Sequence, residues 1–429
     1  MTVDVQAAPP PSRLPAGLRA FRHRNYRLFW TGMLISLTGT WMQSVGQAWL
    51  VLQLTNDPIA LGLVAAAQFM PVLILGLFGG IVADAVSKRR ALFVTQTVAG
   101  LLALTLAFLV LGGVVQVWQV FVLALLLGVV NAFDMPIRQS FVIEMVGRED
   151  IANAVALNSA VFNLTRIIGP AIAGLLIASI GIAPLFFINA ATYVAMIISL
   201  LLMRPHALHP PVARLALERN VKSIVDRLVE GLRYVRRDKT IFLAISILGT
   251  VSLFALNFSV MIPLVARDLL GGDADTYGFL MSATGVGSLL SALTIAFGAR
   301  PTMRRLLVGA AVIGISMIGL GISRNLFLSL GLMFLAGWGT IAMAATCNTL
   351  IQINVPDVLR GRVASVYTTV FAGSTPFGGL FSGAMAALGG PGAALVVGGS
   401  MAVLAALVGA WQVTGGPRLQ RRAEQVPMT

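Results

Sequence analysis

The chain contains twelve long stretches of nearly uninterrupted apolar residues. A helix needs roughly 20 residues to cross a hydrocarbon core about 30 Å thick, so each stretch is long enough to span a membrane. Only 11% of the residues are charged and 57% are hydrophobic. Because a soluble domain carries about 25% charged residues, this composition excludes a soluble protein. The expected spans are 28–53, 59–83, 91–112, 116–135, 155–178, 182–203, 241–265, 276–298, 306–323, 326–350, 363–388 and 391–414.

A polar segment divides these spans into two sets of six. The sequence therefore predicts an all-α integral membrane protein built from two six-helix halves. The expected parts are an N-terminal tail at 1–27, a first half at 28–203, a linker at 204–240, a second half at 241–414 and a C-terminal tail at 415–429.

Basic residues are distributed unevenly over the connections between the spans. The net charge is +14, and all lysines and arginines except Arg166, Arg267 and Arg324 lie in the tails and the even-numbered connections. Short loops rich in Lys and Arg stay on the cytoplasmic side. We therefore expect a bacterial-type cytoplasmic membrane protein with both termini in the cytoplasm. The charge excess is a topology signal, so no nucleic-acid partner is needed, and membrane lipids are the expected partners of a monomer.

The linker contains an amphipathic pattern. Its apolar residues recur at helical spacing with arginines and lysines between them, which predicts a helix lying along the membrane surface. Two interpretations remain open, a solvated connector between the halves and a docking element for anionic lipids. The apolar positions are Val221, Ile224, Val225, Leu228, Leu232 and Val235.

The two halves repeat one another weakly. Arg89 and Arg90 correspond to Arg304 and Arg305, and a short gap places Pro170 on Pro376. Repeated halves are typical of secondary transporters, which bind substrate near the membrane midplane between them.

Several motifs give the chain a resemblance to a known family. Residues 80–90, Gly-Ile-Val-Ala-Asp-Ala-Val-Ser-Lys-Arg-Arg, resemble the signature loop of the major facilitator superfamily, although Ala85 and Ser87 depart from its usual residues. Trp41-Met42-Gln43, residues 134–139 and Asn163-Leu164-Thr165-Arg166 are similar to the enterobactin-exporter-like branch. The resemblance covers residues 20–415. It implies the major facilitator fold and small-molecule efflux by alternating access.

The signature loop implies a gate between the halves. Asp84 would accept hydrogen bonds at the membrane surface, and Arg138 is a candidate partner. The alternative is that the basic residues only fix topology. The expected gating residues are Gly80, Asp84, Lys88, Arg89, Arg90 and Arg138.

Arg166 lies inside an expected span. An arginine at a span centre costs roughly 2.5–3.5 kcal/mol on insertion scales, so it should face protein or water. It either binds an anionic or catecholate group of a substrate, or lies nearer the membrane surface, where it snorkels or braces Asp134.

Other polar residues interrupt the apolar spans. Because unpaired amides are costly in lipid, most should face the interior, where they either line a substrate cavity or join helices. These cavity candidates are Gln43, Gln47, Gln68, Asn158, Asn189, Asn257, Asn348 and Tyr367.

Gly169, Pro170 and Gly174 resemble a motif associated with exporters of this superfamily. Pro170 removes a backbone hydrogen bond and bends its helix, and Pro376 is expected to do the same in the second half. Generic helix packing is the alternative.

Proton coupling needs an embedded group that can change its charge. Asp134 is the best candidate, and the alternative is a structural pair with Arg138 one turn later. The three histidines lie in expected cytoplasmic segments. No phosphate loop, zinc-binding spacing or nucleophile elbow is present, so we expect neither an enzyme nor a cofactor or metal site.

The sequence thus predicts a secondary transporter that exports a small organic molecule, such as a siderophore or a hydrophobic drug, with proton antiport as the candidate coupling. Two alternatives remain. One is a lipid or lysolipid flippase or an importer of the same fold, and the other is a membrane scaffold or receptor that does not transport.

Overall fold

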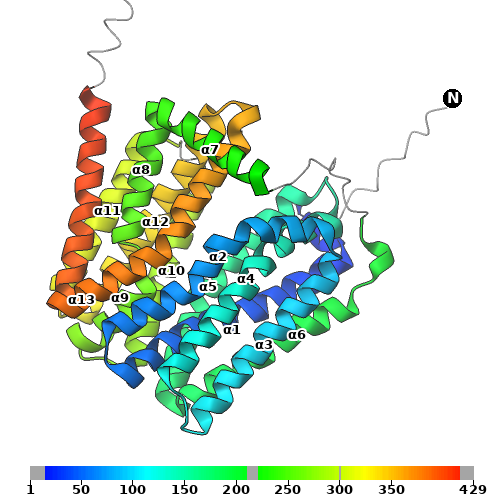
Figure 1. Ribbon diagram of the computed structural model, residues 1–429, viewed down its shortest axis with the longest axis horizontal. Coiled ribbons are helices and arrows are strands. Elements are labelled where there is room, and N and C mark those ends of the chain that lie inside the picture. Colours follow the sequence, from blue (N-terminus) through cyan, green and yellow to red (C-terminus); the bar gives the residue numbers. More distant parts are fainter. Residues whose placement is uncertain (1–14, 210–220, 299–300, 416–429) are drawn as a thin grey trace, which may run out of the picture.

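The first six-helix half surrounds a polar interior helix. The computed structural model describes residues 15–209, 221–298 and 301–415. Helix α1 packs against α5 and α6, and α2 packs against α4 (Figure 1). The elements of this half are η1 (Ala16–Arg22), α1 (Arg24–Thr55), α2 (Pro58–Ala85), α3 (Lys88–Leu111), α4 (Val117–Val146), α5 (Ile151–Ile180), α6 (Ile182–Leu202) and η2 (Pro205–Ala207).

The second half begins after the surface helix α7 and contains two interrupted spans. Its first span is broken at Asn257 and ends in a short π-helix, η3. Its last helix, α13, contains two spans joined at Gly390, whose φ of 79° turns the chain. The elements are α7 (Val221–Arg237), α8 (Lys239–Phe254), α9 (Phe258–Leu264), η3 (Val265–Leu269), α10 (Ala274–Ala296), α11 (Met303–Ile322), α12 (Leu326–Asn354) and α13 (Asp357–Gly415).

The helices account for twelve membrane spans. In the described residues, ten segments are long and apolar enough to cross a membrane, and one of them is the bent α13, which supplies two spans. Helix α1 is not among the ten, because polar residues such as Ser36, Gln43 and Gln47 lower its hydropathy. Its 32 residues nevertheless extend about 48 Å, and its polar side chains are buried among its neighbours. The predicted twelve-helix fold is confirmed.

Both halves use the same close helix contact. In α4, a Cβ at Gly128 would overlap the carbonyl oxygen of Gln68 in α2, and in α12, a Cβ at Gly337 would overlap that of Thr284 in α10. Each glycine is the twelfth residue of its helix, and each carbonyl belongs to the eleventh residue of its own. Small residues allow such close approach in membranes, where apolar burial does not drive helices together. The two halves are therefore structural repeats.

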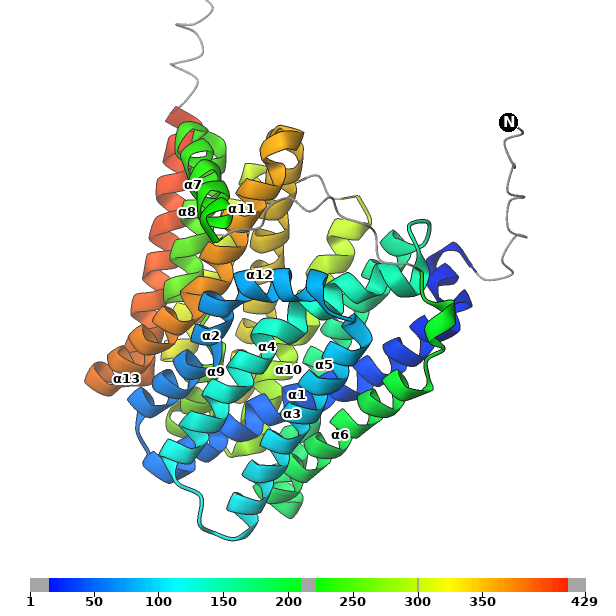
Figure 2. The same cartoon turned by 45° about the vertical axis from the view of Figure 1, so that its right-hand side comes forward.

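The halves meet through α5 with α10 and through α2 with α13. We call the end of the bundle that carries η1 and α7 the linker end, and the opposite end the far end. Gly62 lies against Gly379, Gly174 lies against Asp275, and the Trp49 ring stacks on Tyr277 at 6.4 Å, all between the far end and the middle. Toward the linker end the halves diverge (Figures 1 and 2). At the linker end, a cluster of buried hydrophobic residues contains only residues of the first half, so it does not continue into the second half.

Helix α7 lies across the linker end of the second half (Figure 1). It packs on α13, where Gly231 meets the Arg362 backbone and Glu230 forms an ion pair with the Arg362 side chain. Val229 and Leu232 are exposed. The side chains of residues 221–227 lie outside the described part of this helix.

We expect Gly337→Ala to destabilise the protein, because the added methyl group collides with backbone rather than with a movable side chain. Overpacking costs about 1–3 kcal/mol. The loss of stability is measured as a lower melting temperature of the purified protein in detergent, with gel filtration after heating to detect the unfolded fraction. Gly331→Ala in the same helix is the matched control, since nothing lies within 4 Å of its position. Equal melting temperatures for the two variants would contradict this contact.

Candidate functional site

Asp134 is the centre of a buried polar network in the first half. The carboxylate is 5% exposed and accepts four hydrogen bonds. Thr95 Oγ1 donates to Oδ1 at 2.6 Å, and Gln96 Nε2 donates to the same oxygen at 2.8 Å. Arg138 donates to Oδ2 through Nε at 3.0 Å and Nη2 at 2.8 Å. The network joins α3 to α4, and Ser36 extends it to α1.

Asp134 and Arg138 form the i,i+4 ion pair that the sequence offered as the alternative to proton coupling. This pair engages Nε and Nη2 of Arg138. The Nη1 atom of Arg138 is buried without a hydrogen-bond partner among the described residues. Asp84 was the other expected partner of Arg138, but its side chain lies outside the described part of the structure. Within the described residues, the arrangement is therefore a buried ion pair in which one donor of Arg138 has no partner.

The second half lacks this network. Asp134 and Arg138 are the eighteenth and twenty-second residues of α4. The same positions of α12 hold Met343 and Cys347, both fully buried. The fold therefore accommodates apolar side chains at these positions, and the charges in the first half are not required by the helix packing that the halves share.

Arg166 lies on the interior side of α5. Thr165 and Gly169 face α1, whereas Ile167, Pro170 and Gly174 contact α10. At 100° per residue, Arg166 falls between these two faces, and the exposed Leu164, Ile168 and Leu175 lie on the opposite side of the helix. The Arg166 side chain thus faces the region between the halves rather than the surrounding lipid.

The exposure of this interior face changes at Arg166. Ala173, two turns toward the far end, is completely buried. Ser159 and Phe162, toward the linker end, are exposed. Arg166 itself is partly exposed and has no hydrogen bond or ion pair with any described residue, so it does not brace Asp134. The residue at the same position of α13, the sixteenth, is the exposed Ala372. Arg166 is therefore a single cation without a counterpart in the second half.

Most of the other cavity candidates are occupied in contacts between helices. Asn189 donates to Gln43, Gln47 donates to Gln68 at 3.4 Å, and Asn158 accepts from the Tyr26 hydroxyl at 2.9 Å. Gln43, Gln47 and Asn189 are buried. These residues join α1 to α2, α5 and α6, as the alternative of helix joining predicted.

The three candidates of the second half differ from one another. Asn257 donates to the Leu253 carbonyl beside the break in the first span. Tyr367 donates to the Ala344 carbonyl at 3.2 Å. Asn348 is exposed and makes no hydrogen bond with the described residues. Asn348 is thus the candidate of this half that has a free side chain.

The expected gating residues are separated by their contacts. Lys88 Nζ lies 2.6 Å from Glu144 Oε1 in a largely buried ion pair. Arg89 donates to the carbonyls of Leu200 and Leu201 at the end of α6. Gly80 has open space around it, and Arg90 is exposed. Lys88 and Arg89 therefore bind α3 to α4 and α6 within the first half.

The expected helix-bend residues lie where helices meet. Gly169 packs on Trp41 of α1, and Gly174 packs on Asp275 of α10. Pro170 and Pro376 are each the twentieth residue of a helix, which agrees with the alignment of the repeats, and both helices continue through them. Both glycines therefore lie at helix contacts, and Gly174 lies at the contact between the halves.

The sequence reasoning missed Thr95 and Gln96, and it placed Glu144 near the inner end of its span without finding its partner Lys88. Thr95 and Gln96 are polar residues in an otherwise apolar span, a little more than one turn after the basic residues that begin α3. The criterion that selected Gln43, a polar residue inside a span, could have selected them as well. Their shared acceptor could not be deduced without the tertiary structure.

Sequence comparisons relate the chain to known exporters. A model of the transmembrane secretion effector family, within the major facilitator superfamily, matches residues 16–416. The multidrug efflux pump Tap of Mycolicibacterium fortuitum is 30% identical over 81% of this chain and 86% of its own. The staphyloferrin A transporter of Staphylococcus aureus is 23% identical over 82% and 87% of the two chains. The enterobactin exporter EntS of Shigella boydii is 24% identical over 85% and 86%.

A structural comparison gives the same fold. The nucleoside transporter NupG superposes with a TM-score of 0.71 at 15% identity, over 90% of this chain and 97% of that one. Together with the relatives, this confirms the resemblance seen in the signature loop and in the exporter-like motifs. The chain belongs to the transmembrane secretion effector family of the major facilitator superfamily, and it is a multi-pass efflux transporter.

Proposed function

We propose that this transporter exports small amphipathic organic molecules that carry an anionic or catecholate group, such as siderophores. The unpaired Arg166 on the interior face carries this proposal. A guanidinium binds carboxylate or catecholate oxygens through several donors, and its charge is strengthened in a low-dielectric site. The relatives named for staphyloferrin A and enterobactin support this substrate class, and the relative named as a multidrug pump supports hydrophobic drugs as a second one.

We propose that the linker end faces the cytoplasm of a bacterial-type cell and that both termini lie there. The basic residues of the even-numbered connections support this orientation. Two arginines outside the spans, Arg267 and Arg324, do not follow this charge distribution, and each interacts with groups close to it in the chain. Arg267 pairs with Asp268 at 2.5 Å, and Arg324 donates to carbonyls at the end of α11.

Transport would proceed by alternating access. The halves touch between the far end and the middle and diverge at the linker end, so this arrangement corresponds to a state that loads substrate from the cytoplasm. Arg166 lies where the interior face of α5 changes from buried to exposed. A substrate bound there would be released to the far side once the contacts of α5 with α10 open.

Proton antiport would use the Asp134 network. Protonation of Asp134 would remove the negative charge that holds Arg138 and would break some of the four hydrogen bonds that the Asp134 carboxylate accepts. The freed guanidinium would then need new partners, which couples proton binding to a rearrangement of α3 and α4. The apolar counterparts Met343 and Cys347 support a role beyond packing.

We further propose that the protein acts as a monomer among membrane lipids, without nucleic acid, cofactor or enzymatic activity. Coupled transport by two moving halves needs no covalent chemistry and no second copy.

Arg166→Gln should raise the KM for a catecholate siderophore about tenfold or more, because a charge-assisted hydrogen bond contributes about 1.5–3 kcal/mol. Uptake into everted vesicles at matched expression measures this. Arg166→Lys should recover part of the loss, and Arg324→Gln, which removes a cation at the far end, should leave the KM unchanged. Wild-type kinetics for Arg166→Gln would exclude Arg166 from the substrate site.

The double variant Asp134→Met/Arg138→Cys gives α4 the two residues that α12 carries at the same positions. Because both charges leave together, we expect folding to survive and proton coupling to be lost. Uptake into everted vesicles should fall to the level that wild type shows with a proton uncoupler. Arg267→Gln/Asp268→Asn is the control ion pair. Full, uncoupler-sensitive uptake by the Asp134/Arg138 variant would disprove this coupling site.

Cysteine labelling tests the orientation. The one native cysteine, Cys347, is buried and can be replaced by alanine. In that background, Val114→Cys marks the far end and Val358→Cys marks the linker end, since both valines are well exposed. An impermeant maleimide should label Val114→Cys in intact cells and Val358→Cys only in everted vesicles. The reverse pattern would overturn the proposed topology.

A further inference from the structure

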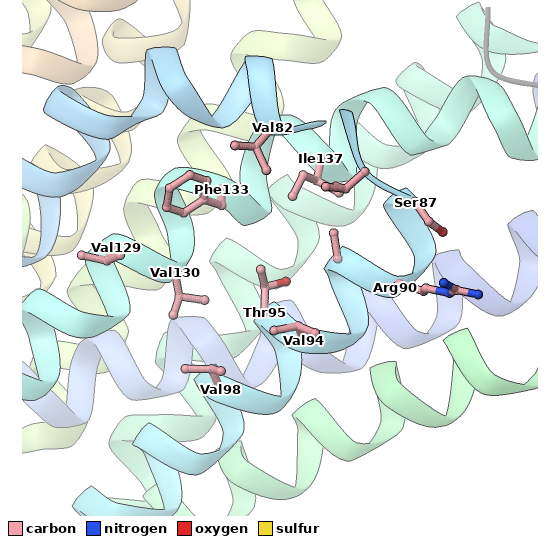
Figure 3. A pocket seen from close by; sticks show the side chains of 12 residues that line it. Val82, Ser87, Arg90, Val94, Thr95, Val98, Val129, Val130, Phe133 and Ile137 are labelled. Carbon is pink, nitrogen blue, oxygen red and sulfur yellow. The ribbon is translucent and has the colours of Figure 1, made fainter. Parts of the chain in front are cut away.

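A groove runs along the outer surface of the first half, between α3 and the pair α2–α4. Its volume is about 600 Å³, and its walls are almost entirely hydrocarbon (Figure 3). The groove exists because α2 and α4 are drawn together at Gly79 and Gly128, while α3 stands further from them. The lining residues are Val82, Val86, Ser87, Arg90, Ala91, Val94, Thr95, Val98, Val129, Val130, Phe133 and Ile137.

The length of the groove along α3 is close to the thickness of the hydrocarbon of one membrane leaflet. Arg90 is the third residue of α3, so it lies at the linker end near the level of the lipid headgroups. Val98 lies eight residues further along the same helix, which corresponds to about 12 Å. Half of a hydrocarbon core is about 15 Å thick. The groove therefore extends from the headgroup level nearly to the midplane, as one acyl chain of a phospholipid does.

Among the described residues that line the groove, Arg90 is the only one with a charged side chain. It is exposed, and no side chain in the described residues pairs with it. Its neighbours in the signature loop differ, because Lys88 pairs with Glu144 and Arg89 binds the end of α6. Figure 3 shows Arg90 and Ser87 together at one end, away from Val98 and Val129. The groove thus combines apolar walls with a cation at one end, Arg90, that has no partner among the described side chains.

We propose that this groove is a binding site for an anionic phospholipid, with its phosphate on Arg90 and one acyl chain along the valines of α3 and α4. The chain fills apolar space that water would occupy unfavourably, and the free cation selects anionic over zwitterionic headgroups. The proposal depends on the membrane-spanning fold and not on the proposed substrate or on proton coupling.

The site would place a lipid directly against the Asp134 network. Thr95 lines the groove, and its hydroxyl donates to Asp134 Oδ1 at 2.6 Å. An acyl chain in the groove packs against this side chain and excludes water from the carboxylate on that side. The lipid therefore stabilises the arrangement of α3 and α4 in which Thr95, Gln96 and Arg138 hold Asp134.

Photolabelling tests the site. The full-length protein is reconstituted in phosphatidylcholine nanodiscs with a trace of phosphatidylglycerol or phosphatidylcholine that carries a diazirine on one acyl chain. Chymotryptic peptides of α3 and α4 are then analysed by mass spectrometry. We expect the phosphatidylglycerol probe to label these peptides about fivefold more than the phosphatidylcholine probe, since one basic residue near the surface contributes about 1 kcal/mol.

Two pairs of variants separate the headgroup from the chain. Arg90→Gln should abolish the preference for phosphatidylglycerol, and Arg90→Lys should keep it. Arg27→Gln, an exposed cation at the same end but outside the groove, is the matched control. Val130→Trp should fill the groove and reduce labelling by both probes, whereas Val122→Trp, on the exposed surface of the same helix, should not. Gel filtration of each variant establishes that it is folded.

Three results would overturn the proposal. Equal labelling by the two probes in the wild type would mean that only ordinary surrounding lipid occupies the groove. A preference that persists in Arg90→Gln would exclude Arg90 as the headgroup contact. Displacement of the probe by a catecholate siderophore but not by excess unlabelled phosphatidylglycerol would make the groove a lateral entrance for substrate.

Discussion

Close contact between backbones organises this protein. Lipid gives helices no hydrophobic reason to associate, so they must be held by packing and by hydrogen bonds between them. Gly128 brings α4 onto the backbone of α2, and Gly337 brings α12 onto that of α10 at the same position of the repeat. These two contacts fix the framework of each half.

Three charged side chains interrupt the structural repeat of the two halves. The shared framework requires glycines at the twelfth position of α4 and α12 and accepts prolines at the twentieth position of α5 and α13. It does not require Asp134, Arg138 or Arg166, whose counterparts are Met343, Cys347 and Ala372. A charge inside a membrane span that the opposite half does without is costly, so these three residues are the ones that helix packing alone does not explain.

The sequence was sufficient for the fold and insufficient for the pairing of its polar groups. Each expected span coincides with helical structure, and only 241–265 is interrupted, at Asn257, because hydropathy and charge placement act along the chain. The Asn189–Gln43 contact could not be predicted, since it joins residues 146 positions apart. Helices that are apolar on nearly every side give no periodic signal to separate a lipid face from an interior face. Arg166 could be recognised as exceptional, whereas the face of α5 on which it lies required the structure.

The contact between the halves consists mainly of packing. In the described residues it contains one hydrogen bond, from Ser282 to the Ile167 carbonyl at 2.8 Å, and no ion pair. Its other contacts are packing contacts, such as Gly62 with Gly379, Gly174 with the Asp275 backbone, and the Trp49 ring with Tyr277. Such contacts provide dispersion attraction while the halves touch, and lipid or substrate can replace most of it when they part. By contrast, the Asp134 network lies within the first half and includes an ion pair. The interaction between the halves and the interaction around Asp134 are therefore of different kinds, because the first is mainly packing and the second is an ion pair within one half.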